Sequence, residues 1–294
     1  MTATITDRPE RVRPPVRQGG SRWSRVASGY LPLVVATLIV VLPLLWMLLS
    51  SFKSPDQLIT QDVQLLPHSV NPANYAEALR TVPFPRLFLN SAVVTVVGAL
   101  TKVVLAVMTA YALVFVEFPF KRSIFVAILI TLMVPPQVSI LPNYILITSL
   151  GGANTYWGII LPGLGTGFGT FLLRQHFMTL PASILEAAEI DGAGHWRRLT
   201  RIVVPISTPS IATVALVSIV FEWNEYLWPL VITTDPQMMT LPVGLTLLSN
   251  SESAAASYGI LMAGSVLVIA PVLLVFIALQ RYIVDGLTQG AVKD

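Results

Sequence analysis

Residues 186–205 read EAAEIDGAGHWRRLTRIVVP and combine a carboxylate, small side chains and a glycine at short spacing. Pro181 suits the first turn of a helix, and Gly192 suits its end. Apolar and small residues recur at i, i+3, i+4 and i+7, so we expect a short helix whose small face lets the backbone of another protein approach closely. A second helix is expected over 195–203. The residues expected to make such a docking contact are Glu186, Ala187, Ala188, Asp191 and Gly192.

A second set of charged and polar residues lies inside apolar stretches of the chain. Lys102 lies inside one stretch, and the run FEWNEYLW places Glu222, Asn224 and Glu225 beside aromatic residues in another. A charged group at the centre of a membrane helix costs about 2.5–3.5 kcal/mol on insertion scales, so these groups should face protein or water rather than lipid. The adjacent prolines at 135 and 136 should break a third stretch beside such a cavity. The expected pathway residues are Lys102, Gln137, Asn143, Glu222, Trp223, Asn224, Glu225 and Tyr226.

Two interpretations of these polar groups remain open. In one, they line a solute pathway in which aromatic rings stack on a polyol and polar groups match its hydroxyls or phosphate. In the other, Lys102 pairs with Glu222 or Glu225 to hold helices together, and the aromatic residues anchor the chain at the membrane interface.

The chain lacks the sequence motifs of the common catalytic sites and of metal sites. No Gly-Lys pair occurs, so the phosphate-binding loop of an ATPase is absent, and there is no G-x-S-x-G nucleophile turn. The chain has no Cys and three scattered His residues, which disfavours a metal site. We therefore expect no catalytic residue, no metal and no cofactor bound by this chain.

The composition places the elements that carry these residues in a membrane. The chain is 54% hydrophobic and 11% charged, whereas an average soluble domain is about 25% charged. Six apolar segments are long enough to cross a bilayer as helices, which takes about 20 residues. They cover residues 30–50, 88–116, 123–147, 156–173, 206–233 and 258–279.

The distribution of Lys and Arg predicts the orientation of these spans. With both termini on one side, that side holds 14 of the 18 basic residues, the other side holds three, and Lys102 lies within a span. Positive residues favour the cytoplasm, so both termini and the 181–205 loop should be cytoplasmic. A basic soluble domain that could bind nucleic acid is absent.

The chain divides into four expected regions. Residues 1–29 form a basic cytoplasmic tail, which suits contact with anionic lipid, and residues 30–85 hold the first span and an external loop. The loop contains NPANYAEAL, which resembles a short external helix. Residues 86–282 form the core that includes the 181–205 loop, and residues 283–294 form a C-terminal tail.

Several motifs are similar to one family of transport proteins. The 186–205 segment resembles the EAA loop of ABC-importer permeases, with Val204 where Leu is usual. The runs FLNSAVVT, TAYALVFVEFPF, MVPPQVSILPNYIL, WNEYLWPL and LQRYIVDGLTQGAVK extend this resemblance over nearly the whole chain, to the MalG-like permeases of carbohydrate importers. Within that family, the run GTFLLRQHFMTLP and the 102–111 spacing look most like glycerol-3-phosphate permeases.

The resemblance implies an all-α membrane protein with six transmembrane helices and the MetI-like fold of type I importers. It also implies a multi-pass location in the cell membrane, a second related permease, an ATPase dimer that holds ATP and Mg, and an external solute-binding protein. The five residues named for the docking helix would couple to that ATPase. Membrane lipid is the remaining expected partner.

The solute is expected to be glycerol-3-phosphate or a glycerophosphodiester. A cation in the pathway suits a phosphorylated polyol, whereas two glutamates suit a cationic head such as choline. The alternative solute is a neutral oligosaccharide of the maltose or trehalose type. A polytopic enzyme or a channel is a further alternative, but neither a catalytic constellation nor a pore motif is present.

Overall fold

The computed structural model describes residues 22–58, 66–68, 70–249 and 254–288. Contacts divide the chain into two units, 1–46 and 47–294. Residues 1–21 of the expected N-terminal tail and 289–294 of the expected C-terminal tail lie outside the described residues, whereas 22–29 and 283–288 belong to helices. The described residues form helices and no strand, as expected for an all-α protein.

Three helices are long and apolar enough to cross a membrane without interruption. α1 (Arg22–Ser50) includes the candidate span Gly29–Ser50, and its residues up to 46 belong to the first unit. α4 (Phe84–Phe115) and α15 (Ala254–Thr288) lie in the second unit. α4 runs for 32 residues because its proline lies in the first turn, where no intrahelical N–H is lost.

Three further spans are bent pairs of helices rather than straight rods. α5 (Lys121–Leu132) meets η1 (Pro136–Ser139) and α6 (Ile140–Ser149) at 91°. α7 (Tyr156–Ile160) and η2 (Leu161–Gly163) meet α8 (Gly167–Phe177) at 49°. The segment 195–206 meets α12 (Thr208–Asn224) at 82°. The expectation of a break at Pro135 and Pro136 is confirmed, because these residues lack the N–H that would continue the helix.

Two of the expected spans end at places different from those predicted. The helix expected over 206–233 stops at Asn224, and a separate short helix, α13 (Leu227–Ile232), follows an extended Glu225. The span expected over 156–173 is interrupted near the glycines at 163 and 165 and continues to Phe177. The first break lies at the end of the polar run EWNE and the second lies among glycines, so each interrupts a segment whose average hydropathy is that of a full span.

The remaining helices are short and lie outside the long spans. α2 (Pro55–Leu58), α3 (Ala73–Thr81) and α14 (Leu241–Ser249) surround one end of α4 and α15, and α3 is the short helix expected from NPANYAEAL. α9 (Ala182–Ile190), α10 (His195–Arg198), η3 (Leu199–Val203) and α11 (Val204–Ile206) form the 181–206 loop.

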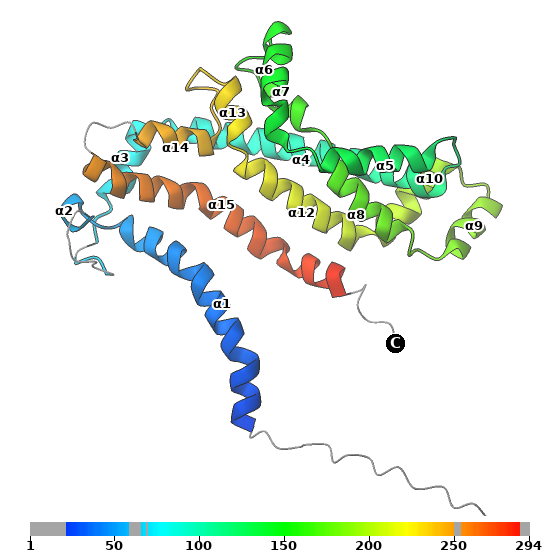
Figure 1. The fold of residues 1–294 in the computed structure, drawn as a ribbon, viewed down its shortest axis with the longest axis horizontal. Coiled ribbons are helices and arrows are strands. Elements are labelled where there is room, and N and C mark those ends of the chain that lie inside the picture. The colour runs from blue at the N-terminus through cyan, green and yellow to red at the C-terminus, as the bar shows by residue number, and fades with distance from the viewer. Residues whose placement is uncertain (1–21, 59–65, 69, 250–253, 289–294) are drawn as a thin grey trace, which may run out of the picture. The chain divides into compact units, whose positions relative to one another are not determined.

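Three apolar clusters hold the second unit together. α4 lies beside α8 and α12, and α12 also lies beside α15 (Figure 1). One cluster joins α4, α8 and α12 to Leu185 of the 181–206 loop. A second joins the start of α4 to α3, α14 and α15, and a third joins its middle to α7 and α13.

Candidate functional site

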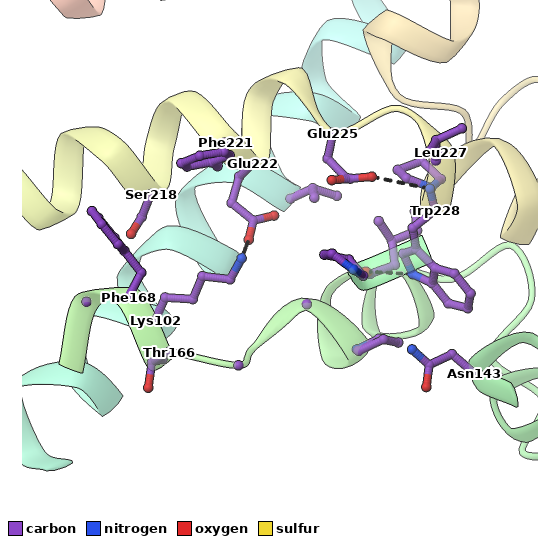
Figure 2. A pocket seen from close by; sticks show the side chains of 18 of the residues that line it. Lys102, Asn143, Thr166, Phe168, Ser218, Phe221, Glu222, Glu225, Leu227 and Trp228 are labelled. Carbon is purple, nitrogen blue, oxygen red and sulfur yellow. Dashed lines mark hydrogen bonds and ion pairs between the residues drawn. The ribbon is translucent and has the colours of Figure 1, made fainter. Parts of the chain in front are cut away.

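A pocket of about 470 Å³ lies where α4 and α12 meet the breaks after α5, before α8 and at Glu225 (Figure 2). α4 contributes Val94 and Lys102, α12 contributes five residues between Val214 and Glu222, and the break segments contribute glycines, prolines and amide side chains. The polar residues that line it are Lys102, Gln137, Asn143, Thr166, Ser218, Glu222 and Glu225. Much of the remaining lining is apolar, so the pocket has a few polar groups on an apolar wall, as many small-molecule sites do.

An ion pair crosses the pocket between the two long helices. The ammonium of Lys102 on α4 contacts the carboxylate of Glu222 on α12 (Figure 2), and the two side chains are 20% and 10% exposed. A Cβ placed on Gly98 would lie 3.0–3.2 Å from the Glu222 carboxylate atoms. The glycine therefore makes room for that carboxylate one turn from Lys102 on α4. Ser91, Thr95 and Gly98, on the Lys102 side of α4, are buried.

The second carboxylate of the pocket has a separate role. Glu225 ends α12 in an extended conformation, and its Oε1 accepts a hydrogen bond of 3.3 Å from the backbone N–H of Trp228. The carboxylate thus caps the first turn of α13, where free N–H groups favour a negative charge. Trp228 is buried, and its Nε1 donates to the carbonyls of Gly158 and Ile159 at 3.1 and 3.0 Å. These contacts hold the break in α12–α13 against α7.

The two amide residues expected beside the proline break both reach the pocket. Gln137 lies in η1, directly after the break, and Asn143 lies in the first turns of α6. The bend of 91° turns this part of the chain toward the pocket instead of continuing α5. Neither amide forms a side-chain hydrogen bond within the part of the chain that the structure describes.

Three of the expected pathway residues do not line this pocket. Trp223 faces α15, where its Nε1 donates a 3.0 Å hydrogen bond to the carbonyl of Val268 and its ring packs edge-on against Phe88. Asn224 is exposed and donates to the carbonyl of Val220, and Tyr226 is also exposed. Successive residues on a helix point about 100° apart, so Glu222 and Trp223 face different neighbours.

The pocket also contains residues that the sequence analysis did not select. Ser218 and Phe221 precede Glu222 by four and one positions on α12, Thr166 directly precedes α8, and Phe168 lies in its first turn. The run LPGLGTGFGT holds four glycines inside an apolar segment. Such an interruption was a usable signal, because an irregular backbone at membrane depth is tolerated only beside protein or a cavity.

The 181–206 loop has the two-helix form expected from its sequence. Gly192 has φ +74°, and the N–H of Ala193 donates to the carbonyl of Ala188 at 2.9 Å, which ends α9 in a Schellman-type turn. Glu186, Ala187 and Asp191 are exposed. Ala188 and Leu185 are buried on the opposite side, so α9 packs through one face and presents the other.

Polar contacts stabilise this loop internally and join it to the end of α4. Arg198 is buried and forms an ion pair of 3.0 Å with Glu189 on α9. The hydroxyl of Tyr111 on α4 lies 3.2 Å from Nδ1 of His195. The same Nδ1 lies 3.4 Å from Nη2 of Arg198, and since a guanidinium only donates, Nδ1 accepts. The loop is thus held by both apolar packing and charge-assisted hydrogen bonds.

Among the described residues, no three His, Asp or Glu side chains lie close enough together to hold an ion.

Comparison with known proteins agrees with this architecture. The family described as "binding-protein-dependent transport system inner membrane component" matches residues 102–289. The sn-glycerol-3-phosphate transport system permease protein UgpE of Brucella suis is 37% identical over 268 residues, which cover 89% of this chain and 95% of that protein. UgpE of Yersinia pestis is 32% identical over 267 residues, with coverage of 89% and 95%.

Solved structures show the same fold. A chain of a bacterial ABC transporter involved in the import of the acidic polysaccharide alginate aligns with a TM-score of 0.78 at 24% identity, covering 90% of this chain and 99% of that one. A chain of the alginate transporter in complex with a pentasaccharide-bound periplasmic protein aligns with a TM-score of 0.62 at 14% identity. The family match, the near-complete alignment with these relatives and the shared fold together show that the chain belongs to the family of binding-protein-dependent transport system inner membrane components, as a permease subunit of an ABC importer and not an enzyme.

Proposed function

We propose that this permease carries a phosphorylated polyol, sn-glycerol-3-phosphate or a glycerophosphodiester, into the cytoplasm. The pocket at the helix breaks would lie on the solute pathway, with Lys102, Gln137, Asn143, Glu222 and Glu225 as its polar contacts. The relatives of Brucella and Yersinia carry sn-glycerol-3-phosphate in their names, which supports this class of solute.

The Lys102–Glu222 pair is the observation that carries the proposal. Of the described residues that line the pocket, Lys102 alone is basic, and Glu222 neutralises it. A phosphate group with one or two negative charges can replace the carboxylate at the ammonium, whereas a neutral solute has no such exchange to offer. Breaking a buried ion pair without a substitute costs about 3–5 kcal/mol, so the exchange favours ligands that bring their own anion.

The second carboxylate favours the diester over the simple monoester. Glu225 leaves the pocket with more negative than positive side chains, and Phe221 and Trp228 supply aromatic rings beside it. A cationic head such as choline is attracted both by a carboxylate and by a ring face. The same apolar and aromatic wall also suits a neutral oligosaccharide, which remains the second candidate.

Transport requires partners that supply energy and deliver the solute. We propose a second permease of the same family, an ATPase dimer that holds ATP and Mg, and an external solute-binding protein. The exposed Glu186, Ala187 and Asp191, with Ala188 and Gly192 shaping the helix, would form the contact with the ATPase. The distribution of basic residues supports a cytoplasmic position for this loop and for both termini in the cell membrane.

Uptake by the reconstituted transporter tests the solute and the pocket together. The measurement is uptake per assembled complex of labelled sn-glycerol-3-phosphate, glycerophosphocholine and maltose, for wild type, Lys102→Met and the charge-retaining Lys102→Arg. We expect Lys102→Met to lose most uptake of both phosphate compounds and Lys102→Arg to retain a measurable part. Glu225→Gln should reduce uptake of glycerophosphocholine more than that of the monoester.

Two results would contradict the proposal. If the wild type takes up maltose and neither phosphate compound, the transporter is an oligosaccharide importer instead. The second result is normal uptake per complex in Lys102→Met and Glu222→Gln, although each single variant assembles with low yield. If the double variant also recovers the yield, the pair serves helix packing alone.

A further inference from the structure

A second cavity of about 470 Å³, separate from the solute pocket, opens where α5 begins and α8 ends. Three of its lining residues are basic: Lys121 and Arg122 in the first turn of α5, and Arg174 in the last turn of α8. The other described residues that line it are apolar, and none of them is acidic. We propose that this cavity binds the phosphate group of an anionic phospholipid at the cytoplasmic face of the membrane.

Lys121 and Arg174 are held in place but keep donors for a ligand. Lys121 Nζ donates to the carbonyls of Val114 and Val116 at 2.9 and 3.1 Å, which caps the end of α4 and leaves a third ammonium N–H. The guanidinium of Arg174 lies 4.0 Å from the centroid of the Phe125 ring, which fixes its plane.

The two arginines lack anionic partners in the described part of the chain. The ion pairs found there join Lys102 to Glu222 and Arg198 to Glu189. Arg122 is exposed, and Nε of Arg174 is buried with no hydrogen-bond partner. A buried unpaired donor costs free energy, which a phosphate oxygen would recover, and a guanidinium can bind phosphate through two parallel hydrogen bonds.

The start of α5 adds to the attraction for an anion. Phe120 has a left-handed conformation and provides no side-chain cap, and the first N–H of the helix that bonds within it is that of Ile124, to the carbonyl of Phe120. The N–H groups of the first turn and the positive end of the helix dipole therefore lie beside the basic side chains.

The walls of the cavity favour a lipid over a free ion. Phe125, Val126 and Leu129 of α5 line it, and the exposed side chains of Ile124 and Ile130 extend the apolar surface along that helix. The distribution of Lys and Arg places the 117–122 and 174–180 segments on the cytoplasmic side. Basic pockets between membrane helices on that side suit acidic headgroups, whose acyl chains then lie on the neighbouring apolar surface.

Native mass spectrometry of the assembled transporter tests the site. The complex is reconstituted in bilayers of phosphatidylcholine with phosphatidylglycerol, extracted in neutral detergent, and examined for retained phosphatidylglycerol. The variants are Arg122→Gln/Arg174→Gln, the charge-retaining Arg122→Lys/Arg174→Lys, and Arg80→Gln as a control that removes one cation from the external end of α3. We expect about a fivefold weaker retention for each cation removed from the site. Arg80→Gln should stay near wild type. The lysine variant, which keeps the charge but loses the paired guanidinium donors, should fall between wild type and the glutamine variant.

Competition identifies the source of the phosphate group. Inorganic phosphate is added to the complex, with chloride at equal ionic strength as the control. If the complex retains as much phosphatidylglycerol in phosphate as in chloride, the result supports a lipid site. The wild-type complex could instead retain no phosphatidylglycerol but gain thermal stability from inorganic phosphate, with this gain lost in Arg122→Gln/Arg174→Gln. That result would replace the lipid with a soluble phosphate. Wild-type retention in Arg122→Gln/Arg174→Gln, or an equal loss in Arg80→Gln, would overturn the site, provided that subunit stoichiometry is unchanged.

Discussion

At the scale of single residues, the pocket depends on close packing around one ion pair. Lys102 and Glu222 come from different helices, and the missing side chain of Gly98 is what lets the carboxylate lie against α4. Gly163 lies nearby but less tightly, since a Cβ there would be 3.8 Å from Lys102 Nζ and 3.9 Å from Glu222 Oε1. A methyl group would therefore press against the ion pair at Gly98 but would make ordinary contacts with it at Gly163.

Gly98→Ala should reduce uptake per assembled complex, because the new methyl group displaces the Glu222 carboxylate from Lys102. Gly163→Ala is the matched control and should stay close to wild type, because its Cβ makes ordinary contacts. The measurement is uptake of the phosphate solute in proteoliposomes, normalised to complex. Equal uptake by the two variants would show that the position of the carboxylate does not matter for transport.

Substitutions of the two buried tryptophans on either side of Glu225 should affect stability and transport differently. Trp223→Phe removes the hydrogen bond to Val268 and should cost about 1 kcal/mol, seen as a lower thermal midpoint of the complex with normal uptake. Trp228→Phe removes the bonds to Gly158 and Ile159 at the pocket and should lower both quantities. A transport defect in Trp223→Phe as severe as that in Trp228→Phe would contradict this division.

At the scale of elements, interrupted helices carry the functional groups. The breaks at Pro135–Pro136, at the glycines before α8 and at Glu225 all contribute residues to the pocket. The 181–206 loop is likewise two short helices joined by a turn with Gly192 at φ +74°. α9 can present its exposed face only if that turn keeps its shape.

Gly192→Ala should weaken coupling between transport and ATP hydrolysis, because a side chain at positive φ costs about 1–2 kcal/mol and reshapes the end of α9. Gly194→Ala is the control, since its φ is −66° and no atom lies near its Cβ position. Solute-stimulated ATPase activity of the reconstituted complex is the measurement. Wild-type stimulation in both Gly192→Ala and Glu186→Ala would reject the loop as the coupling contact.

At the scale of the whole molecule, charge asymmetry predicts the orientation in the membrane. The absence of Cys makes this testable with single introduced thiols. Ser183 and Gln237 are both exposed and lie on loops expected on opposite sides. In intact cells, an impermeant thiol reagent should label Gln237→Cys and leave Ser183→Cys unlabelled until the membrane is opened. Labelling of Ser183→Cys from outside would reverse the orientation and remove the lipid site from the cytoplasmic face.

The sequence by itself determined the membrane class, the helical fold, the family and the break at Pro135–Pro136. These properties depend on local features, namely long apolar runs, residues that lack an N–H and a glycine at a helix end. It also selected Lys102, Gln137, Asn143, Glu222 and Glu225, since polar groups in apolar helices are costly unless they face protein or water.

Only the tertiary structure decided which of these groups meet. The choice of Glu222 over Glu225 as the partner of Lys102 depends on the packing of α12 against α4 at Gly98, and Trp223 turns to α15 because neighbouring residues on a helix face different directions. The solute pocket and the basic cavity between α5 and α8 join segments far apart in the chain. Hydropathy and local spacing carry no information about such contacts, because the residues that form them are brought together by packing rather than by their positions along the sequence.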